Sequence, residues 1–188
     1  MTRTNRRQFL QGAAACAAPL FVPASVLGLA RSAARDEKAD PFVTNIRVAG
    51  PYMLNRRRHV PPEAPEKSTD VSWGRTRVDR TGRIYLLAAG SGAPGVTFVT
   101  ASIEAPEALT TRLLLGSEAD LEVWLNGRRV YAGRPGPSPS TPDQAAADVE
   151  LQKGRNVLLV KASYSGDPSL YLRFRDPDRK LRYPKPGE

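Results

Sequence analysis

Two tryptophans, Trp73 and Trp124, are the residues of this chain best suited to hold a sugar, because the flat face of an indole packs well against an apolar pyranose face. Trp124 lies in a predicted β-hairpin, where strand alternation places it on one face with Glu122, Arg129 and Tyr131. That face is either an exposed amphipathic platform or part of a sandwich core. Core packing is favoured for Trp124, since large aromatics dominate burial energetics, whereas Trp73 lies near a long loop and stays ambiguous.

Three consecutive arginines, Arg56, Arg57 and Arg58, precede His59 in a long loop. The simpler interpretation is a solvated loop. The functional interpretation is an anion-binding lip for sulfated or carboxylated sugars, because arginine pairs bidentately with such groups. His59 is the only histidine, and a Ser/His/Asp triad would have to use it, but no Gly-x-Ser-x-Gly turn is present.

The remaining motifs do not predict catalysis. Residues 90–95 match the glycine fingerprint of dinucleotide-binding proteins, which works only between a strand and a helix N-terminus. Here strands are predicted on both sides and Pro94 lacks an N–H, so an inter-strand turn is the better interpretation. A glycosidase carboxylate pair would converge only in three dimensions, and most acids fall in turns or face outward. We expect no catalytic residue, no metal site and no cofactor.

The first 35 residues have the character of an export signal and linker. Arg6 and Arg7, followed by Phe9 and Leu10, match the twin-arginine consensus, and an apolar stretch extends to residue 22. This segment predicts a signal helix outside the fold and a periplasmic or secreted protein, membrane-anchored if the signal stays uncleaved. A lipoprotein site at Cys16 is a minority alternative, because the usual upstream leucine is missing.

More than half of the net positive charge lies outside the predicted domain. The net charge is +9, but five of the 28 basic residues lie in the first 35 positions, which hold no acid. Residues 36–188 therefore carry 23 basic and 19 acidic groups, a net +4. A nucleic-acid partner is disfavoured. After removal of the signal no cysteine remains, so the fold has no disulfide and depends on its core.

Short apolar runs separated by turn residues predict an all-β fold. Asn126-Gly127 between β-prone arms predicts a two-residue type I′ hairpin, with Leu125 opposite Arg128, Trp124 opposite Arg129, Val123 opposite Val130 and Glu122 opposite Tyr131. Apolar residues on both faces of 96–100 and 157–160 predict central strands. The expected strands cover residues 42–49, 71–78, 83–88, 96–103, 110–115, 121–125, 128–132, 148–151, 156–163 and 169–175.

The pattern divides the chain into three segments. They are a signal peptide and linker over 1–35, a β-sandwich domain over 41–178, and a basic, Pro-rich tail over 179–188. Two long loops, 55–69 and 133–145, interrupt the strands, and the second contains four prolines. Loops of this length in a compact domain are either functional or disordered.

Residues 113–127 and 142–161 together resemble the galactose-binding-like jelly-roll domains attached to many bacterial glycoside hydrolases and cell-surface proteins. The opening Ile46-Arg47-Val48-Ala49-Gly50-Pro51-Tyr52 is similar to the first strand of such domains. The resemblance implies a jelly-roll β-sandwich of the carbohydrate-binding-module type. Where relatives have adjacent aspartates before the hairpin, this chain has Glu118-Ala119-Asp120, which weakens a calcium site.

These observations predict an exported, non-catalytic module that binds carbohydrate or a cell-surface polymer, with an anionic polysaccharide among the candidates. The twin-arginine translocase would be its partner during export. Two alternatives stay open: an accessory domain that contacts an exported protein partner, and a small hydrolase. Of the two regions, the long loops are favoured over the hairpin as the binding site.

Overall fold

In the described part of the chain, ten antiparallel strands pair into two sheets that face each other. The computed structural model describes residues 40–53, 71–86 and 94–184, and Asp40–Glu188 form one compact unit. The strands are β1 (Arg47–Met53), β2 (Gly74–Arg75), β3 (Ile84–Tyr85), β4 (Gly95–Ala105), β5 (Leu109–Ser117), β6 (Asp120–Leu125), β7 (Arg128–Gly133), β8 (Ala145–Leu151), β9 (Gly154–Tyr164) and β10 (Ser169–Phe174).

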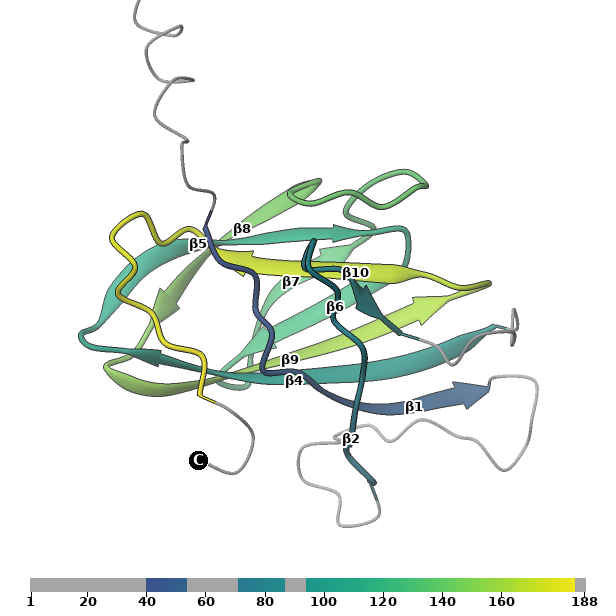
Figure 1. The fold of residues 1–188 in the computed structure, drawn as a ribbon, viewed down its shortest axis with the longest axis horizontal. Helices are drawn as coiled ribbons and strands as arrows, with labels where there is room; N and C mark the ends of the chain where they lie inside the picture. The colour runs from purple at the N-terminus through teal and green to yellow at the C-terminus, as the bar shows by residue number, and fades with distance from the viewer. Residues whose placement is uncertain (1–39, 54–70, 87–93, 185–188) are drawn as a thin grey trace, which may run out of the picture. The chain divides into compact units, whose positions relative to one another are not determined.

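The strand order identifies a jelly-roll β-sandwich, as the sequence predicted. One sheet has the order β2-β1-β4-β9-β6-β7 and the other β3-β10-β5-β8 (Figure 1). From β4 onward the chain crosses repeatedly between the two sheets, which is how this fold buries both inner faces. The described residues include no helix long and apolar enough to cross a membrane. The predicted signal helix lies outside them.

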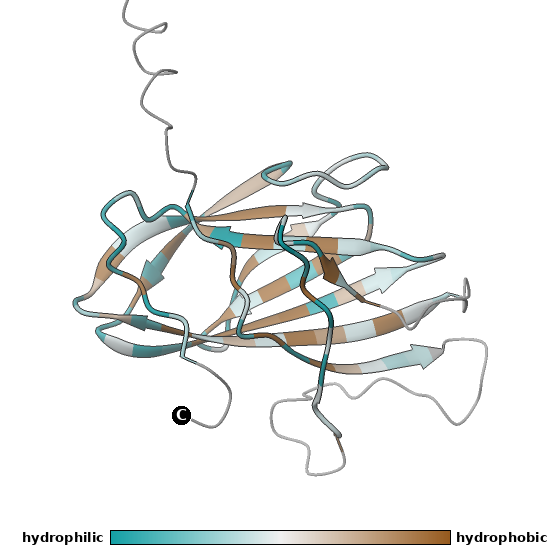
Figure 2. Ribbon diagram, in the orientation of Figure 1, coloured by the Kyte–Doolittle hydropathy of each residue, from teal (hydrophilic) through white to brown (hydrophobic). Residues whose placement is uncertain are grey.

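Side-chain alternation builds the main core between the sheets. On β10, Leu170, Leu172 and Phe174 are fully buried, while Arg173 points to the opposite face. Tyr171 shares the outer face with Arg173 but is buried as well, because the ring of Phe42 packs beside it with centroids 6.1 Å apart. Figure 2 shows the apolar residues distributed along the strands of both sheets.

The two strands predicted to be central do form the middle of the larger sheet. β4 and β9 pair over their full eleven residues, from Gly95 opposite Tyr164 to Ala105 opposite Gly154. Their inward residues join the main core. On the outward side, Val96 and Phe98 of β4 form a second apolar cluster with Ala49 of β1. The residues that pack against this cluster are Tyr52, Val71, Trp73 and Leu159. Apolar residues on both faces therefore mark strands with a core on one side and a smaller cluster on the other.

The Asn-Gly hairpin forms where predicted, but its register contains a bulge. Asn126 and Gly127 have φ values of 52° and 80°, as a type I′ turn requires. The pairs next to the turn are as predicted, but Val123 then faces Tyr131 instead of Val130, and Glu122 faces Ala132 instead of Tyr131. The cause is one extra residue in β7, which turns both Val130 and Tyr131 toward the main core.

Two predicted strands near the N-terminus are divided between the sheets. Phe42 bridges Arg173 in the smaller sheet, whereas β1 starts at Arg47 in the larger one and continues through Gly50-Pro51. The prediction of one strand over 42–49 was wrong because the chain crosses over at Asn45, whose amide donates to the carbonyls of Ser102 and Pro184. Residues 71–78 likewise give only the short β2.

One buried asparagine holds two turns together. The Asn156 side chain is fully buried; its Nδ2 donates to the carbonyls of Gln152 and Gly154, and its Oδ1 accepts from the Gln152 N–H at 2.8 Å. The same oxygen accepts from Asn126 Nδ2 at 2.8 Å, and Asn126 Oδ1 accepts from the Val157 N–H. The β8–β9 turn is thereby tied to the β6–β7 hairpin.

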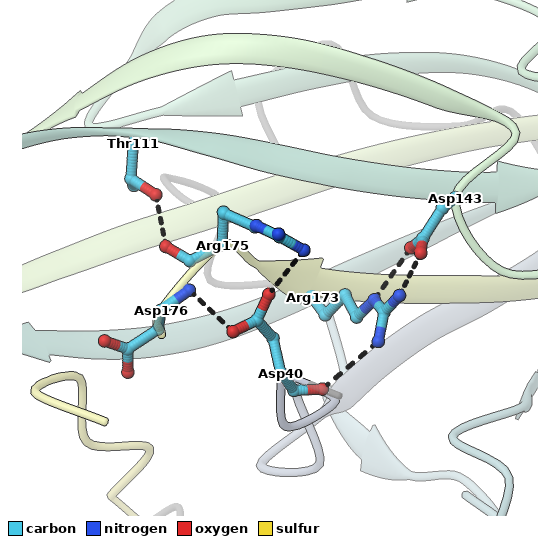
Figure 3. Close-up of polar contacts among 6 residues, drawn as sticks. All are labelled: Asp40, Thr111, Asp143, Arg173, Arg175 and Asp176. Atoms are coloured by element: carbon cyan, nitrogen blue, oxygen red, sulfur yellow. Dashed lines mark hydrogen bonds and ion pairs between the residues drawn. The ribbon is translucent and has the colours of Figure 1, made fainter. Parts of the chain in front are cut away.

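The two ends of the described chain meet at a pair of buried carboxylates. Asp40 Oδ1 accepts from the Asp176 N–H at 3.0 Å, and its other oxygen faces the Arg175 guanidinium at 3.5 Å (Figure 3). The Asp176 carboxylate accepts from the N–H groups of Lys180 and Leu181. Arg182 then exchanges two backbone hydrogen bonds with Glu104 of β4, so the segment after β10 is fixed to the larger sheet.

We predict that Asn156→Ala lowers the free energy of unfolding by about 2–4 kcal/mol, because it leaves several buried backbone groups without partners. Urea denaturation measures this change. Gln152→Ala is the matched control, since its side chain is exposed and only its backbone serves the turn; we expect a change within about 0.5 kcal/mol. Equal stability of the two variants would contradict the role given to Asn156.

Candidate functional site

The Pro-rich segment 134–144 covers part of the outer face of the smaller sheet, at Gly116 of β5 and at Ser169 and Arg173 of β10. A Cβ added to Gly116 would lie 1.9 Å from the Thr141 carbonyl oxygen, so the segment rests directly on β5. The hydroxyls of Ser140 and Ser169 share a hydrogen bond of 2.6 Å, and Arg173 forms a bidentate ion pair with Asp143 (Figure 3). One of the two loops favoured for binding is therefore fastened down as a cover.

The outer face of the larger sheet carries a row of aligned side chains that crosses all six strands. In this cross-sheet row each residue lies directly opposite the next in the strand register. Its members, in order from β2 to β7, are Arg75, Arg47, Thr100, Leu159, Trp124 and Arg129. Apolar and aromatic groups thus occupy the middle of the row, and arginines occupy both ends.

Trp124 is a surface residue of this row, so its predicted core role was wrong. Leu121, Val123 and Leu125 fill the inward positions of β6, and Trp124 alternates to the outer face, where it is half-buried. Glu122 shares this face and pairs with Lys161 at 2.9 Å and with Arg129 at 3.7 Å. The alternation that buries three aliphatic neighbours leaves the indole partly open to solvent.

Trp73 lies on the same outer face, next to the start of β2. It packs against the cluster of Ala49, Val96 and Phe98, and its carbonyl accepts a hydrogen bond of 3.1 Å from Arg47. Tyr52 contacts Phe98 edge-on, with ring centroids 5.9 Å apart. Trp73 and Trp124 are both half-buried, which leaves part of each ring for a ligand.

Of the other predicted binding residues, only Tyr131 and Arg129 lie in the described part of the chain. Tyr131 does not lie on the outer face, because the bulge directs it to the main core, where burial raises the pKa of its phenol. Arg129 lies on the outer face, opposite Trp124. Outside the described residues lie Arg56, Arg57 and Arg58 of the predicted anion-binding lip, and Arg6, Arg7, Phe9 and Leu10 of the predicted export signal.

A separate groove of about 390 Å³ opens between the β6–β7 hairpin and β8. Arg128 and Arg129 contribute to its lining from the hairpin, and Asp148 and Glu150 from β8; no aromatic ring lines it. Asp148 pairs with the exposed Arg112 at 2.9 Å. The groove offers charged partners but no flat apolar surface.

The described part of the outer face presents indole rings beside hydrogen-bonding groups. The described residues contain no group of three or more His, Cys, Asp or Glu side chains that could hold a metal ion. Glu122, which lies beside the cross-sheet row, is engaged by two cations, Lys161 and Arg129. Indole faces with hydrogen-bonding groups around them can hold a ligand without converting it.

Several residues of the face were missed by the sequence analysis. Arg47, Arg75, Thr100 and Leu159 come from four different strands, and their alignment depends on long-range register. The outward position of Leu159 was visible only as an apolar residue on both faces of one strand. No local signal pairs Arg47 with Arg75.

Comparison with known proteins gives likenesses of fold only. No family model matches the chain, and no curated protein matches it. Among solved structures, a family 35 carbohydrate-binding module from Clostridium thermocellum shares 17% identity over 50% of this chain and 87% of its own, with a TM-score of 0.35. A family 35 module in complex with a disaccharide containing glucuronic acid shares 20% identity over 61% of this chain and 89% of its own, with a TM-score of 0.37.

A third solved structure covers more of the chain. An anti-sigma factor domain-containing protein shares 10% identity over 79% of this chain and 48% of its own length, with a TM-score of 0.47.

We predict that acrylamide quenches the fluorescence of both tryptophans. Trp73 and Trp124 are the only tryptophans in the chain, so Trp73→Phe and Trp124→Phe variants report one indole each. Both rings are half-buried, and each should show quenching between that of a free indole and that of a core residue. Complete protection of Trp124 would contradict its position on the outer face.

Proposed function

We propose that this protein is an exported binding module that holds a polysaccharide across the outer face of its larger sheet. The observation that carries the proposal is the placement of Trp73 and Trp124, both partly open, on the same sheet face. The smaller sheet carries no tryptophan among its described residues, and segment 134–144 covers part of its outer face.

The spacing of the two tryptophans suits a polymer better than a single sugar. Trp73 directly precedes β2, and Trp124 lies on β6, four strand spacings away in the order β2-β1-β4-β9-β6. Adjacent strands are about 4.8 Å apart, so the two positions are separated by about 19 Å across the sheet. Several linked sugar rings would be needed to contact both.

Polar groups around the indoles could fix the orientation of a sugar. Thr100 stands in the cross-sheet row between the arginine pair and Leu159, and Lys161 and Arg129 border Trp124. Sugars carry hydroxyls that both donate and accept, and a few well-placed polar groups beside an apolar platform give specificity in such sites. The proposed site is open and shallow, as binding along a chain requires.

The groove between the hairpin and β8 favours a second function, contact with a protein partner. Its opposed arginine and carboxylate walls fit the polar rim of a protein interface better than they fit a sugar. Co-purification of a stoichiometric partner that is lost on Glu150→Lys, without any polysaccharide binding, would establish this function in place of the first.

We predict that Trp124→Ala and Trp73→Ala each weaken polysaccharide binding about tenfold or more, because each removes an aromatic platform. Affinity electrophoresis in gels containing neutral polysaccharides measures the effect, and intrinsic fluorescence follows binding in solution. Trp124→Tyr should keep most of the affinity, since it keeps an aromatic face.

Val157→Ala is the matched control for these variants. Val157 is also exposed on the outer face of the larger sheet, at 41%, but it carries no ring. Its variant should bind as the parent does. If neither tryptophan variant differs from the Val157 control, the outer face is not the sugar site.

We also predict that replacing Arg6 and Arg7 with lysine retains the protein in the cytoplasm, because the paired arginines are the export determinant. Cell fractionation of a bacterium with an active twin-arginine pathway measures this. A variant at Arg31 and Arg35, which lie outside the consensus, should be exported normally. Unchanged export of the first variant would contradict the proposed route.

A further inference from the structure

Arginines of the described chain differ in whether a carboxylate lies within reach. Those of a first group each face a carboxylate; the pairs are Arg112 with Asp148, Arg129 with Glu122, Arg134 with Asp120, Arg173 with Asp143, and Arg175 with Asp40. Those of a second group lie together on β1 and residues 75–85 and have no carboxylate partner within the described ranges; they are Arg47, Arg75, Arg77, Arg80 and Arg83. Arg128, Arg155 and Arg182 also lack such a partner there, but they are dispersed over β7, β9 and the segment after β10.

Four members of the second group lie on one hairpin, residues 75–85, which we name the arginine hairpin. It runs from β2 at the edge of the larger sheet to β3 at the edge of the smaller one (Figure 1). Val78 bridges Ile84, and the Tyr85 N–H donates to the Arg77 carbonyl at 3.2 Å. The turn is fixed as well, because a Cβ on Gly82 would lie 2.1 Å from the ring of Phe42. The backbone that carries these four arginines is therefore held in one conformation.

The one acid of the arginine hairpin does not neutralise them. Asp79 Oδ1 accepts from the N–H and the hydroxyl of Thr81 and from the Arg83 N–H, at 2.6 to 3.1 Å. Its Oδ2 faces the Tyr85 hydroxyl at 3.3 Å. The Thr81 hydroxyl, followed by these backbone donors, holds the pKa of Asp79 below its ordinary value. Both oxygens of the carboxylate serve the turn.

Two of the cations are placed directly against each other. Arg47 on β1 lies opposite Arg75 on β2 in the strand register, with both side chains on the outer face. Like charges in directly opposed positions are unfavourable in a sheet. An anion bound between them would remove this repulsion, so the pair is a cost to the free protein that a ligand can relieve.

Two further cations are held in place by an aromatic ring. The guanidinium carbons of Arg77 and Arg83 each lie 5.4 Å from the centroid of the Tyr85 ring. Cation–π contacts of this kind orient a guanidinium without using its N–H donors. The donors of the exposed Arg77 stay available for a ligand.

We propose that the arginine hairpin, together with Arg47, binds the sulfate esters of a sulfated polysaccharide whose sugar chain lies on the neighbouring tryptophans. This inference rests on the proposed function, because Trp73 directly precedes β2 and shares the outer face with the Arg47–Arg75 pair. The polysaccharide would pass from the cross-sheet row onto the arginine hairpin.

Sulfate fits this arrangement for two chemical reasons. A sulfate ester presents three terminal oxygens, so it can accept hydrogen bonds from two guanidinium groups at once, whereas a single bidentate arginine already engages both oxygens of a carboxylate. The five cations also span two edges of the sandwich, which suits charges repeated along a polymer better than one small anion.

The test compares matched neutral and sulfated polymers: dextran with dextran sulfate, and hydroxyethyl cellulose with cellulose sulfate. Polygalacturonate provides a carboxylated arm. Binding is measured by tryptophan fluorescence and calorimetry at several salt concentrations. We expect the sulfated member of at least one pair to bind about tenfold or more tightly than its neutral partner, with an affinity that falls as salt rises. Polygalacturonate should bind more weakly than the sulfated polymer.

The variant Arg75→Gln with Arg80→Gln should lose about tenfold or more of the affinity for the sulfated polymer, since each charge-assisted hydrogen bond contributes strongly. The matched control is Arg112→Gln with Arg134→Gln, which removes the same charge from arginines that are exposed but paired. The single variant Arg75→Gln should also raise the thermal midpoint of the free protein, because it ends the repulsion with Arg47. A purely structural role for Arg75 predicts a lower midpoint.

Each other outcome overturns the proposal. Equal losses in the two double variants would show attraction to overall charge instead of a site. Equal binding of neutral and sulfated polymers, sensitive only to Trp73→Ala and Trp124→Ala, would refute the sulfate inference and leave the polysaccharide face standing. Binding to none of the polymers would refute both. Stronger binding of polygalacturonate would assign the arginines to carboxylates.

Discussion

The register between β4 and β9 is the constraint on which the rest of the molecule depends. These strands pair without interruption over eleven residues, and each residue is committed either to the main core or to the outer face. A shift of one residue would exchange the two sets. Asn156 fixes the start of β9 on the side away from β4, because it ties the turn before β9 to the β6–β7 hairpin.

The two outer faces of the sandwich differ in how far the chain itself covers them, and a few contacts decide the difference. Gly116 allows the backbone at Thr141 to lie on β5, and Arg173 then fastens the same segment through Asp143. On the larger sheet the outward residues of β4 include Val96 and Phe98, against which aromatic neighbours pack. One face is partly closed by the chain itself, and the other keeps indole surface that a ligand can cover.

The sequence predicted what depends on neighbouring residues and failed where distant residues decide. The Asn126-Gly127 turn and the two pairs next to it follow from local backbone preference. The bulge does not, because it arises from the fit of Val130 and Tyr131 to the core beneath them. Trp124 was assigned to a core on its size, whereas its exposure follows from the alternation of its strand. The opposition of Arg47 and Arg75, 28 positions apart, has no local signature at all.

The joining of the chain ends at Asp40 has a mechanical consequence. If the domain is held at its N-terminal side and its ligand is held on the outer face, tension enters the fold at Asp40. That residue is bonded to the backbone of Asp176, and Val43 is bonded to Leu172 of β10. The load therefore passes first into the smaller sheet, before the chain crosses at Asn45 and enters β1 of the larger sheet. A tether placed there is resisted by the hydrogen bonds to Asp176 and Leu172 before it reaches the strands beside the tryptophans.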